Sequence, residues 1–350
     1  MRIAQIAPLT ESVPPRLYGG TERVVSFLTE ELVAMGHEVT LFASGDSRTS
    51  ANLEACWPSA LRFDESLRDA IAPHMLMIEE VRRRAGDFDV LHCHLDYWPF
   101  SVLSRQSTPF LTTLHGRLDL DEHGAMYNRF PEVPLVSISD AQRRPLPRVN
   151  FIDTVHHGLP VDLLTPRDMK RDYLAFLGRI TPDKGPDRAI RIARETGIPL
   201  KIAAKVDRVD QEYYNTVIRQ MIDGVHVEMI GEIADHEKSE FLSGAHALLL
   251  PIDWPEPFGL VMIEAMACGT PVIASRYGSV PEIIDDGLTG FIVDSHEEAV
   301  AAVGRVDRLS SSAIRARFEQ RFTARRMAED YVALYNHIGV RTRPLLRVVT

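Results

Sequence analysis

The sequence predicts an α/β protein built from two doubly wound domains. Short apolar runs alternate with helix-forming stretches along the chain, which is the pattern of βαβ units around a parallel sheet. The 350 residues suffice for two domains of about 150 to 180 residues each. Polar and charged residues follow several predicted strands, where open parallel sheets bind their ligands.

Composition and charge narrow the class of protein. Hydrophobic residues make up 45% and charged residues 25% of the chain, with a net charge of -10, so a general nucleic-acid-binding role is disfavoured. No apolar run approaches the roughly 18 residues needed to span a bilayer. The N-terminus opens on a strand instead of a signal-peptide pattern. Three isolated thiols without metal-ligand spacing, Cys56, Cys93 and Cys268, fit a reducing compartment. We therefore expect a cytoplasmic protein without a bound cofactor or metal.

The first predicted βαβ unit contains a Gly-Gly turn. Residues 2–7 form a buried strand, a loop rich in Pro and Gly follows, and a helix begins near Thr21 or Glu22. Residues 39–43 are the next strand. The Gly19-Gly20 pair lacks the dinucleotide-binding spacing, so a tight turn without a ligand stays an alternative to a ligand-binding turn.

Three further strands are predicted before the domain boundary, over residues 90–94, 110–114 and 135–139. Before these strands, residues 46–87 contain a long polar stretch and a helix from His74 to Arg84. Its terminal arginines are typical of a solvated face, with a membrane-binding role as the alternative. His92 and His94 share a strand face, so a metal pair is conceivable, although only Asp96 lies near as a third ligand. His115 follows a strand, where it either borders a ligand or is a hydrogen-bonded structural residue. We expect the domain boundary at about residues 160–170.

The second half repeats the alternation and brings two cations beside a helix start. A strand over residues 173–179 ends in Arg179, and Lys184 precedes a helix that begins at Pro186 or Asp187. Cations at the end of a strand and next to a helix N-terminus suit a diphosphate. Strands follow at residues 199–205 and 225–232, and an amphipathic helix spans Met327 to Ile338.

Residues 247–269 form the most informative stretch. A buried strand ends at Leu250, a Pro-rich loop follows, and a helix from Phe258 or Gly259 ends at Gly269. The free N–H groups of the first helical turn favour an anion. Glu256 and Glu264 lie eight positions apart, so they can hold the two ends of one ligand, as in a nucleotide sugar. The alternative is an ordinary strand, loop and helix with a solvated Glu264.

This stretch resembles the Glu-x7-Glu signature of retaining glycosyltransferases of family 4. The runs at residues 269–274, 278–282 and 287–293 also match that family, as does the pair Gly178-Arg179 followed by Lys184-Gly185. The chain departs from the family at His157, where Asn is usual, and at Ala204-Lys205, where glycines are common.

The resemblance implies a fold and a set of site residues. It implies a GT-B fold, in which two doubly wound Rossmann-like domains face each other across a cleft. The acceptor-binding domain would span residues 1–163, with a C-terminal helix at about residues 327–345 packed back on it, and the donor-binding domain residues 164–326. The implied catalytic residues are Glu256, His115, Arg179 and Lys184. The implied substrate-binding residues are Gly19, Gly20, Arg179, Lys184, Ile233, Glu256, Phe258, Gly259, Leu260 and Glu264.

The implied reaction is the transfer of a hexose, with retention, from a nucleoside diphosphate sugar. UDP-sugars are favoured over GDP-sugars, and the acceptor is a sugar, a small molecule or a lipid. Arg179 and Lys184 would replace a metal ion, since no Asp-x-Asp stands in the donor site. A sugar-nucleotide 2-epimerase, a catalytically silent nucleotide-sugar binder and a membrane-associated lipid glycosyltransferase remain alternatives, although the acidic balance disfavours strong binding to anionic membranes.

Overall fold

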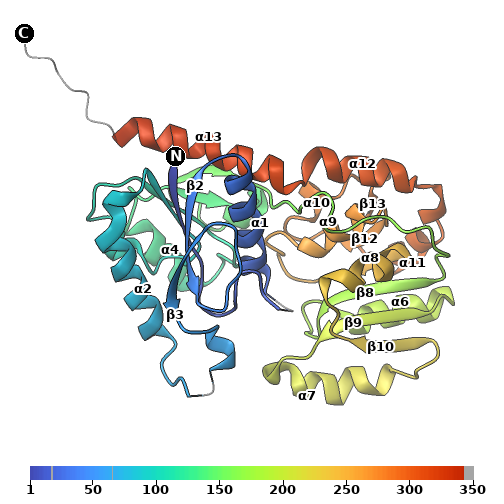
Figure 1. The fold of residues 1–350 in the computed structure, drawn as a ribbon. Helices are drawn as coiled ribbons and strands as arrows, with labels where there is room; N and C mark the ends of the chain where they lie inside the picture. The colour runs from blue at the N-terminus through green and yellow to red at the C-terminus, as the bar shows by residue number, and fades with distance from the viewer. Residues whose placement is uncertain (17–18, 65, 343–350) are drawn as a thin grey trace, which may run out of the picture. The chain divides into compact units, whose positions relative to one another are not determined.

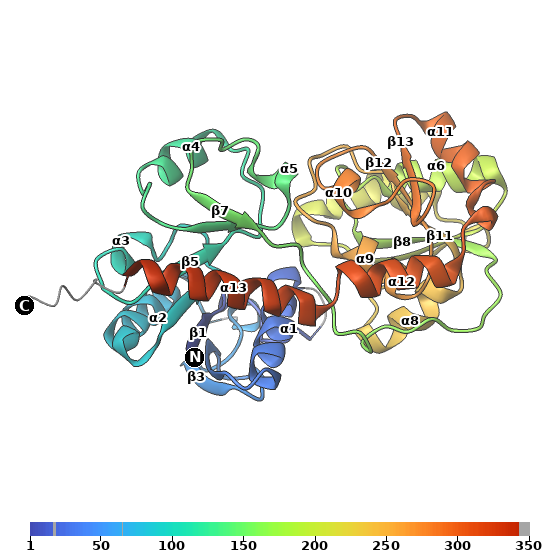
Figure 2. The same cartoon turned by 90° about the horizontal axis from the view of Figure 1, so that it is seen from above.

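The computed structural model describes residues 1–16, 19–64 and 66–342. It divides the chain into two compact units. The first unit contains Met1–Ile138, Arg143–Gly158 and Ala324–Thr350, of which residues 343–350 lie outside the described part. The second unit contains Ser139–Gln142 and Leu159–Thr323 (Figures 1 and 2). Each unit is an α/β structure around a parallel sheet, which confirms the predicted fold class.

The described part of the first unit has a seven-stranded parallel sheet with the order β3-β2-β1-β4-β5-β6-β7. Its strands are β1 (Arg2–Ile6), β2 (Glu38–Ser44), β3 (Asn52–Trp57), β4 (Val90–Cys93), β5 (Phe110–Thr113), β6 (Leu135–Ser137) and β7 (Phe151–Thr154). The strand order reverses between β1 and β4, where Gln5 is in register with His92. A doubly wound sheet binds ligands beyond the carboxyl ends of the strands at such a switch point.

Helices of the first unit cover this sheet. They are α1 (Gly20–Ala34), α2 (Ile71–Arg84), α3 (Phe100–Leu103), α4 (Asp121–Asn128) and α13 (Ala324–Thr342), with the 3-10 turns η1 (Leu61–Phe63) and η2 (Ala85–Asp87). The short helix α5 (Asp140–Arg143) belongs to the second unit except for its last residue. Helix α13 packs against α1. Its buried Met327, Tyr331, Leu334 and Tyr335 recur at helical spacing, so one face of α13 lies on the unit although 169 residues separate its start from the end of β7.

The two faces of the first sheet differ in polarity. Ala4 and Ile6 of β1 belong to an apolar core with Phe42 and Leu91. The alternate residue of β1, Gln5, is fully buried and bonds to Tyr335 of α13. Because successive side chains of a strand point to opposite faces, β1 separates an apolar core from a buried polar layer.

The described part of the second unit has a six-stranded parallel sheet with the order β10-β9-β8-β11-β12-β13. Its strands are β8 (Tyr173–Arg179), β9 (Leu200–Lys205), β10 (Val227–Gly231), β11 (Ala245–Leu250), β12 (Val272–Ser275) and β13 (Gly290–Val293). Its helices are α6 (Pro186–Thr196), α7 (Gln211–Tyr213), α8 (Asp235–Ser243), α9 (Leu260–Ala267), α10 (Val280–Ile283), α11 (His296–Val303) and α12 (Ser311–Arg321), with 3-10 or π turns η3 (Arg208–Asp210), η4 (Tyr214–Ile218), η5 (Arg219–Met221) and η6 (Val306–Arg308). Here the strand order reverses between β8 and β11.

The structure corrects three sequence assignments in the first unit. Strand β3 lies inside the stretch that we predicted as polar loop and helix, and β7 follows the strand that we took as the last of the domain. Both are edge strands that are largely exposed or half-buried, so neither needs a continuous apolar run. Helix α2 begins at Ile71 instead of His74, because the Asp69 carboxylate accepts hydrogen bonds from the first helical N–H groups.

The described helices give one further negative finding. None of them is long and apolar enough to cross a membrane.

Candidate functional site

The carboxyl ends of β8 and β9 hold two cations around one carboxylate. Arg179 is in register with Lys205 on the neighbouring strand. The Asp207 carboxylate lies 3.5 Å from Arg179 Nη1 and 2.9 Å from Lys205 Nζ. Burial alone would raise the pKa of Asp207, but the hydrogen bonds and charges of Lys205 and Arg179 lower it overall. Arg179 Nε is buried without a hydrogen-bond partner among the described residues, so the guanidinium keeps a donor for a further anion.

Lys184 lies just before α6 and is held by the loop that follows β11. Its ammonium forms an ion pair with the Glu256 carboxylate and lies 4.8 Å from the centre of the Trp254 ring. Gly185 is the N-cap of α6 with φ 72°, and a Cβ at this position would lie 2.3 Å from the Pro251 carbonyl oxygen. Only glycine therefore allows the α6 N-terminus to approach this loop so closely.

The loop after β11 leads into the short apolar helix α9. Gly259 is its N-cap with φ 78°, and a Cβ there would approach Met262 Cε to 2.8 Å and Glu256 Cγ to 3.2 Å. The helix thus begins at Leu260, one or two residues later than predicted, because Gly259 has a left-handed conformation. Phe258 is buried against the Phe322 ring. Met262 N donates to the Gly259 carbonyl at 3.0 Å, whereas the N–H groups that precede Met262 have no acceptor within the helix, so α9 presents these groups at its N-terminus.

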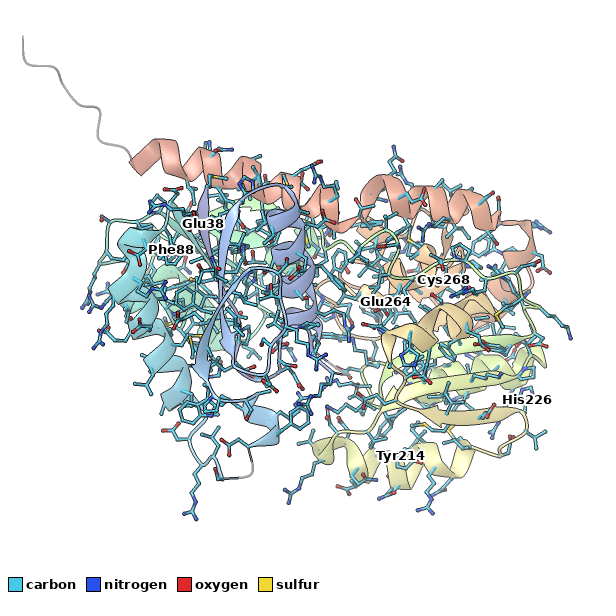
Figure 3. The ribbon with its side chains drawn as sticks, viewed as in Figure 1. Glu38, Phe88, Tyr214, His226, Glu264 and Cys268 are labelled. Atoms are coloured by element: carbon cyan, nitrogen blue, oxygen red, sulfur yellow. The ribbon has the colours of Figure 1, made fainter. Side chains whose placement is uncertain are left out.

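Glu264 lies in the interior of α9, four residues before Cys268 (Figure 3). It is 3% exposed, and its Oε1 lies 2.7 Å from Lys238 Nζ of α8. Lys238 is 8% exposed and also lies 3.1 Å from the Asp235 carboxylate. Glu264 is therefore a buried, paired carboxylate and not a solvated helix residue. Ile233 is partly buried in the loop just before α8.

Within the second unit, the structure brings some predicted residues together directly. Lys184 and Glu256 contact each other, whereas Arg179 pairs with Asp207 and Glu264 pairs with Lys238. All of these groups come from segments that follow β8, β9, β10 and β11 at the carboxyl edge of the sheet. This is the edge, and the switch point, where a doubly wound sheet binds nucleotides.

His115 of the first unit is partly buried and contacts the buried His94 and His157. His115 Nε2 lies 2.8 Å from His94 Nδ1, and His94 Nε2 lies 2.9 Å from Gln5 Oε1. The His115 ring also stacks on His157, with centroids 5.2 Å apart. Burial lowers the pKa of His115 to about 3, and burial followed by the neighbouring histidines lowers the pKa of His94 far below its ordinary value. The cluster is therefore neutral at pH 7.

His92 does not form a metal site with His94. Its two ring nitrogens form hydrogen bonds instead, Nδ1 with the Tyr335 hydroxyl and Nε2 with Thr113 Oγ1, at 2.7 Å each. In the part of the chain that the structure describes, no group of three or more His, Cys, Asp or Glu side chains is arranged to hold a metal ion.

The Gly19-Gly20 turn forms the start of α1. Gly19 is the N-cap, and its carbonyl accepts a hydrogen bond from Arg23 N at 3.2 Å. A Cβ on Gly19 would lie 2.7 Å from Pro15 Cβ, so the turn is too tight for a side chain. Glu22 in the first turn is buried, and burial raises its pKa. Residues 17 and 18 of the predicted loop lie outside the described residues.

Comparison with known families decides the assignment. The family profile described as Glycosyltransferase Family 4 matches residues 18–196, which is more than half of the chain. The profile described as Glycosyl transferases group 1 matches residues 165–325.

The chain belongs to glycosyltransferase family 4. The resemblance seen in the sequence is thereby confirmed. Two curated relatives of this family 4 glycosyltransferase are the D-inositol 3-phosphate glycosyltransferases of Mycolicibacterium smegmatis and Mycolicibacterium paratuberculosis. They are 27% and 26% identical over 257 and 258 residues, respectively, which is 62% of this chain in each case. The chain spans only 59% and 58% of the length of these relatives.

Solved structures confirm the GT-B fold of this family 4 glycosyltransferase. AviGT4, a glycosyltransferase involved in avilamycin A biosynthesis, is 25% identical with a TM-score of 0.72, over 97% of this chain and 98% of AviGT4. The sucrose-phosphate synthase of Thermosynechococcus elongatus is 20% identical with a TM-score of 0.77, over 97% and 99% of the two chains. Anabaena Alr3699/HepE, solved with UDP and glucose, is 18% identical with a TM-score of 0.74, over 96% and 100%.

Several side chains that contact the predicted site residues were not assigned that role from the sequence. Lys238 and Asp207 form the ion pairs described above, and Gln5 and His94 hold His115. A lysine in an acidic, polar helix and a glutamine in a short strand carry no spacing signal of their own. For His94, its position at the end of a strand was the one feature of the sequence that indicated a place at the edge of the sheet where ligands bind.

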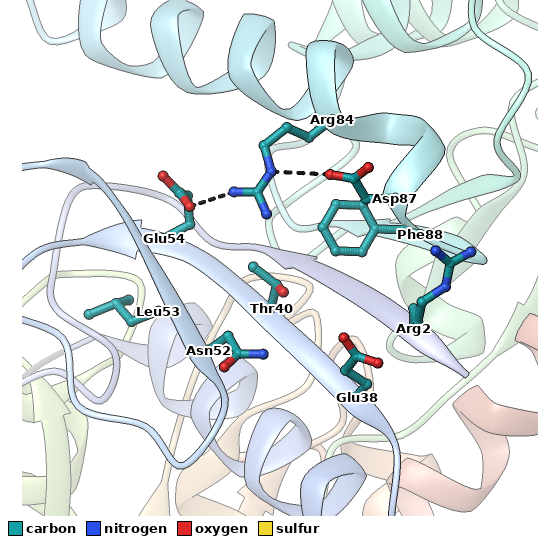
Figure 4. A pocket seen from close by; sticks show the side chains of 9 residues that line it. All are labelled: Arg2, Glu38, Thr40, Asn52, Leu53, Glu54, Arg84, Asp87 and Phe88. Atoms are coloured by element: carbon teal, nitrogen blue, oxygen red, sulfur yellow. Dashed lines mark hydrogen bonds and ion pairs between the residues drawn. The ribbon is translucent and has the colours of Figure 1, made fainter.

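A pocket of about 420 Å³ lies at the opposite end of the first unit's sheet. Its lining includes Arg2, Glu38 and Asn52, the first residues of β1, β2 and β3 (Figure 4). Arg84 lies between Glu54 and Asp87 and pairs with both. Since ligands of doubly wound sheets bind at the carboxyl ends, and since these charges are paired internally, this pocket is not the candidate site of the glycosyltransferase.

Proposed function

We propose that the protein transfers a hexose from a nucleoside diphosphate sugar, with UDP-sugars favoured over GDP-sugars, to a sugar, small-molecule or lipid acceptor with retention of configuration. One observation carries the proposal. At the switch point of the second unit, the carboxyl edge of the sheet gathers the cations Arg179 and Lys184, the buried carboxylates of Glu256 and Glu264, and the start of α9. A donor with a negatively charged diphosphate between two hydroxyl-bearing sugars matches this arrangement. Anabaena Alr3699/HepE, which shares the fold, has been solved with UDP-glucose.

The cations act on the diphosphate. Arg179 and Lys184 bind its oxygens and stabilise the charge that grows on the departing nucleoside diphosphate, so no metal ion is needed. In the structure these cations are paired with Asp207 and Glu256. The donor phosphate competes with the carboxylates for them, and the N–H groups of Phe258, Gly259 and Leu260 add donors at the α9 N-terminus.

The carboxylates act on the two sugars of the donor. Glu256 accepts hydrogen bonds from the transferred hexose, and Lys184 holds Glu256 in position. Glu264 accepts hydrogen bonds from the ribose, with one carboxylate oxygen oriented by Lys238. The backbone around Ile233, just before α8, holds the base.

The first unit supplies the acceptor side of the reaction. The Gly19-Gly20 turn brings backbone N–H groups at the start of α1 close to the donor diphosphate or the acceptor, since no Cβ blocks the approach. His115 contacts the sugar at or near the reacting centre. The curated relatives are named for the acceptor D-inositol 3-phosphate, which makes an inositol phosphate the first acceptor to try.

A ligand panel tests the proposal. Thermal unfolding is measured with UDP, GDP and ADP, since a ligand at 100 times its Kd stabilises the protein by roughly 2.7 kcal/mol. We expect UDP to raise the melting temperature most. Proton NMR of a reaction with the matching UDP-sugar then gives the anomeric configuration of the product. Release of UDP with a retained glycoside supports the proposal, while an epimerised sugar nucleotide or an unchanged donor contradicts it.

A further inference from the structure

A continuous row of hydrogen-bonded side chains crosses the first unit from His115 to α13. Gln5 of β1 lies at its middle. On one side Gln5 Oε1 lies 2.9 Å from His94 Nε2, and His94 Nδ1 lies 2.8 Å from His115 Nε2. On the other side Gln5 Nε2 lies 3.1 Å from the Tyr335 hydroxyl.

The row continues from Tyr335 to a second histidine and a second tyrosine. The Tyr335 hydroxyl lies 2.7 Å from His92 Nδ1, and His92 Nε2 lies 2.7 Å from Thr113 Oγ1. Thr113 Oγ1 in turn lies 2.8 Å from the Tyr331 hydroxyl. Most residues of the row lie within β1, β4, β5 and α13. His94 and His115 follow β4 and β5. The whole row except His115 is less than 9% exposed.

The Gln5 amide gives the row one direction. The amide oxygen can only accept a hydrogen bond, so His94 carries its proton on Nε2 and accepts through Nδ1. His115 must then carry its proton on Nε2, where it donates to His94. On the other side the amide nitrogen donates to Tyr335, which donates to His92, and His92 donates to Thr113. Every donor therefore points away from His115.

The consequence appears at the other nitrogen of His115. With the proton on Nε2, Nδ1 carries a lone pair and no hydrogen. Nδ1 of His115 is buried and has no hydrogen-bond partner among the described residues, which is uncommon for a buried polar atom. An unpaired buried acceptor gains most when a ligand hydroxyl donates to it.

We propose that Gln5 and His94 are positioning residues that present His115 to the sugar as a hydrogen-bond acceptor through Nδ1. The identity of the donating group, a sugar hydroxyl, rests on the proposed function, whereas the tautomer does not. Burial independently lowers the pKa of His115 to about 3, so the ring is neutral at pH 7 and has no proton at Nδ1 to give to a leaving group. Its task is to orient a hydroxyl and not to act as a general acid.

Ring-nitrogen NMR of the full-length protein, labelled with 15N-histidine, tests this directly. The His115 signals are assigned by comparison with His115→Asn. We expect a protonated Nε2 and an unprotonated Nδ1 in the ligand-free wild-type protein. A protonated Nδ1 overturns the proposal, since the row then runs the other way. No ligand is present, so failure of the proposed transferase function leaves this result unaffected.

Two variants separate positioning from packing. Gln5→Met removes the amide that sets the direction, and we expect His115 to become a mixture of tautomers. Tyr335→Phe removes a hydroxyl from the other arm but keeps Gln5, His94 and His115, so we expect the wild-type tautomer. If Gln5→Met keeps the wild-type tautomer, Gln5 is only structural and the proposal fails. If Gln5→Met does not fold, Gln5→Glu, whose carboxylate still accepts from His94, must keep the wild-type tautomer.

Steady-state kinetics with UDP-glucose give a second readout. We expect Gln5→Met to lower kcat about 10-fold, the effect of losing one oriented hydrogen bond, with the donor KM within about twofold. Tyr335→Phe, which loses similar packing, keeps the wild-type kcat. Equal losses of kcat in both variants would contradict a specific role for Gln5.

Discussion

The buried pair of Glu264 and Lys238 gives the sharpest prediction about stability. Their side chains are only 5% and 11% exposed, and the two charged atoms are 2.7 Å apart. Lys238→Met keeps the length of the side chain but leaves the Glu264 carboxylate buried without its cation. Asp235, 3.1 Å from Lys238, loses the same partner but is much more exposed.

The size of the effect follows from burial. Removing one partner from a buried ion pair costs about 3 to 5 kcal/mol, because the other charge stays desolvated. The matched control is Lys170→Met, whose ion pair with Asp172 has side chains 84% and 52% exposed. An exposed pair contributes about 0 to 1 kcal/mol, so the same substitution there should change little. The double variant Lys238→Met, Glu264→Gln should be more stable than Lys238→Met alone, because it removes the stranded charge.

Urea unfolding of the second unit measures these differences. Trp254 is the tryptophan of that unit, while Trp57 and Trp98 belong to the first. In a background with Trp57→Phe and Trp98→Phe, the fluorescence of Trp254 reports on the second unit alone. If Lys238→Met costs no more than Lys170→Met, the pair is not a buried structural contact, and our account of how Glu264 is oriented is wrong.

Three further predictions concern the reaction and its pH dependence. Glu264→Gln should mainly weaken nucleotide binding, by roughly 1.5 to 3 kcal/mol, because ribose is unchanged by the reaction. Glu256→Gln should instead lower kcat more than it raises the donor KM. The opposite pattern in binding titrations and steady-state kinetics would show that the two roles are reversed. Activity should survive excess EDTA, and a loss that magnesium or manganese restores would show that Arg179 and Lys184 do not replace a metal. Burial lowers the pKa of His115 in the folded protein to about 3 from its ordinary value of 6.5, so the unfolded chain takes up the proton first as the pH falls below 6.5. Each such histidine therefore lowers the free energy of unfolding by about 1.4 kcal/mol at about pH 5.5. Removing one buried neutral histidine in His157→Asn should make the melting temperature less sensitive between pH 7 and 5.5, and an unchanged slope would count against this origin.

The sequence predicted the interior of the fold better than its edges. Strands such as β8 and β11 are buried from both sides, so they appear as continuous apolar runs that end in Arg179 and Leu250. The edge strands β3 and β7 contact the sheet on one side only and carry polar residues, so the apolar pattern did not reveal them. The Asp69 cap of α2 was missed because no apolar residue marks the start of that helix on its buried face.

The candidate site was predictable where function requires a motif with fixed spacing. Glu256, Glu264, Arg179 and Lys184 lie in such motifs, and the structure puts them at the carboxyl edge of one sheet. Their partners are fixed by tertiary structure instead. Lys238 reaches Glu264 from a different helix, and Gln5 reaches His94 across 89 positions of sequence. Pairings of this kind leave no periodic signal in a single sequence.

Isothermal titration of UDP tests the central claim, that the carboxyl edge of the second unit binds the donor nucleotide. The comparison needs the wild-type protein, Arg179→Met and the control Arg191→Met. Arg191 lies on α6 of the same unit with its side chain 57% exposed and pairs with Asp187. Loss of one charge-assisted hydrogen-bond donor, about 1.5 to 3 kcal/mol, corresponds to about 10- to 150-fold in Kd. The account predicts that Arg179→Met weakens UDP binding by this factor while Arg191→Met binds like the wild type. Equal UDP affinity in all three proteins would contradict it.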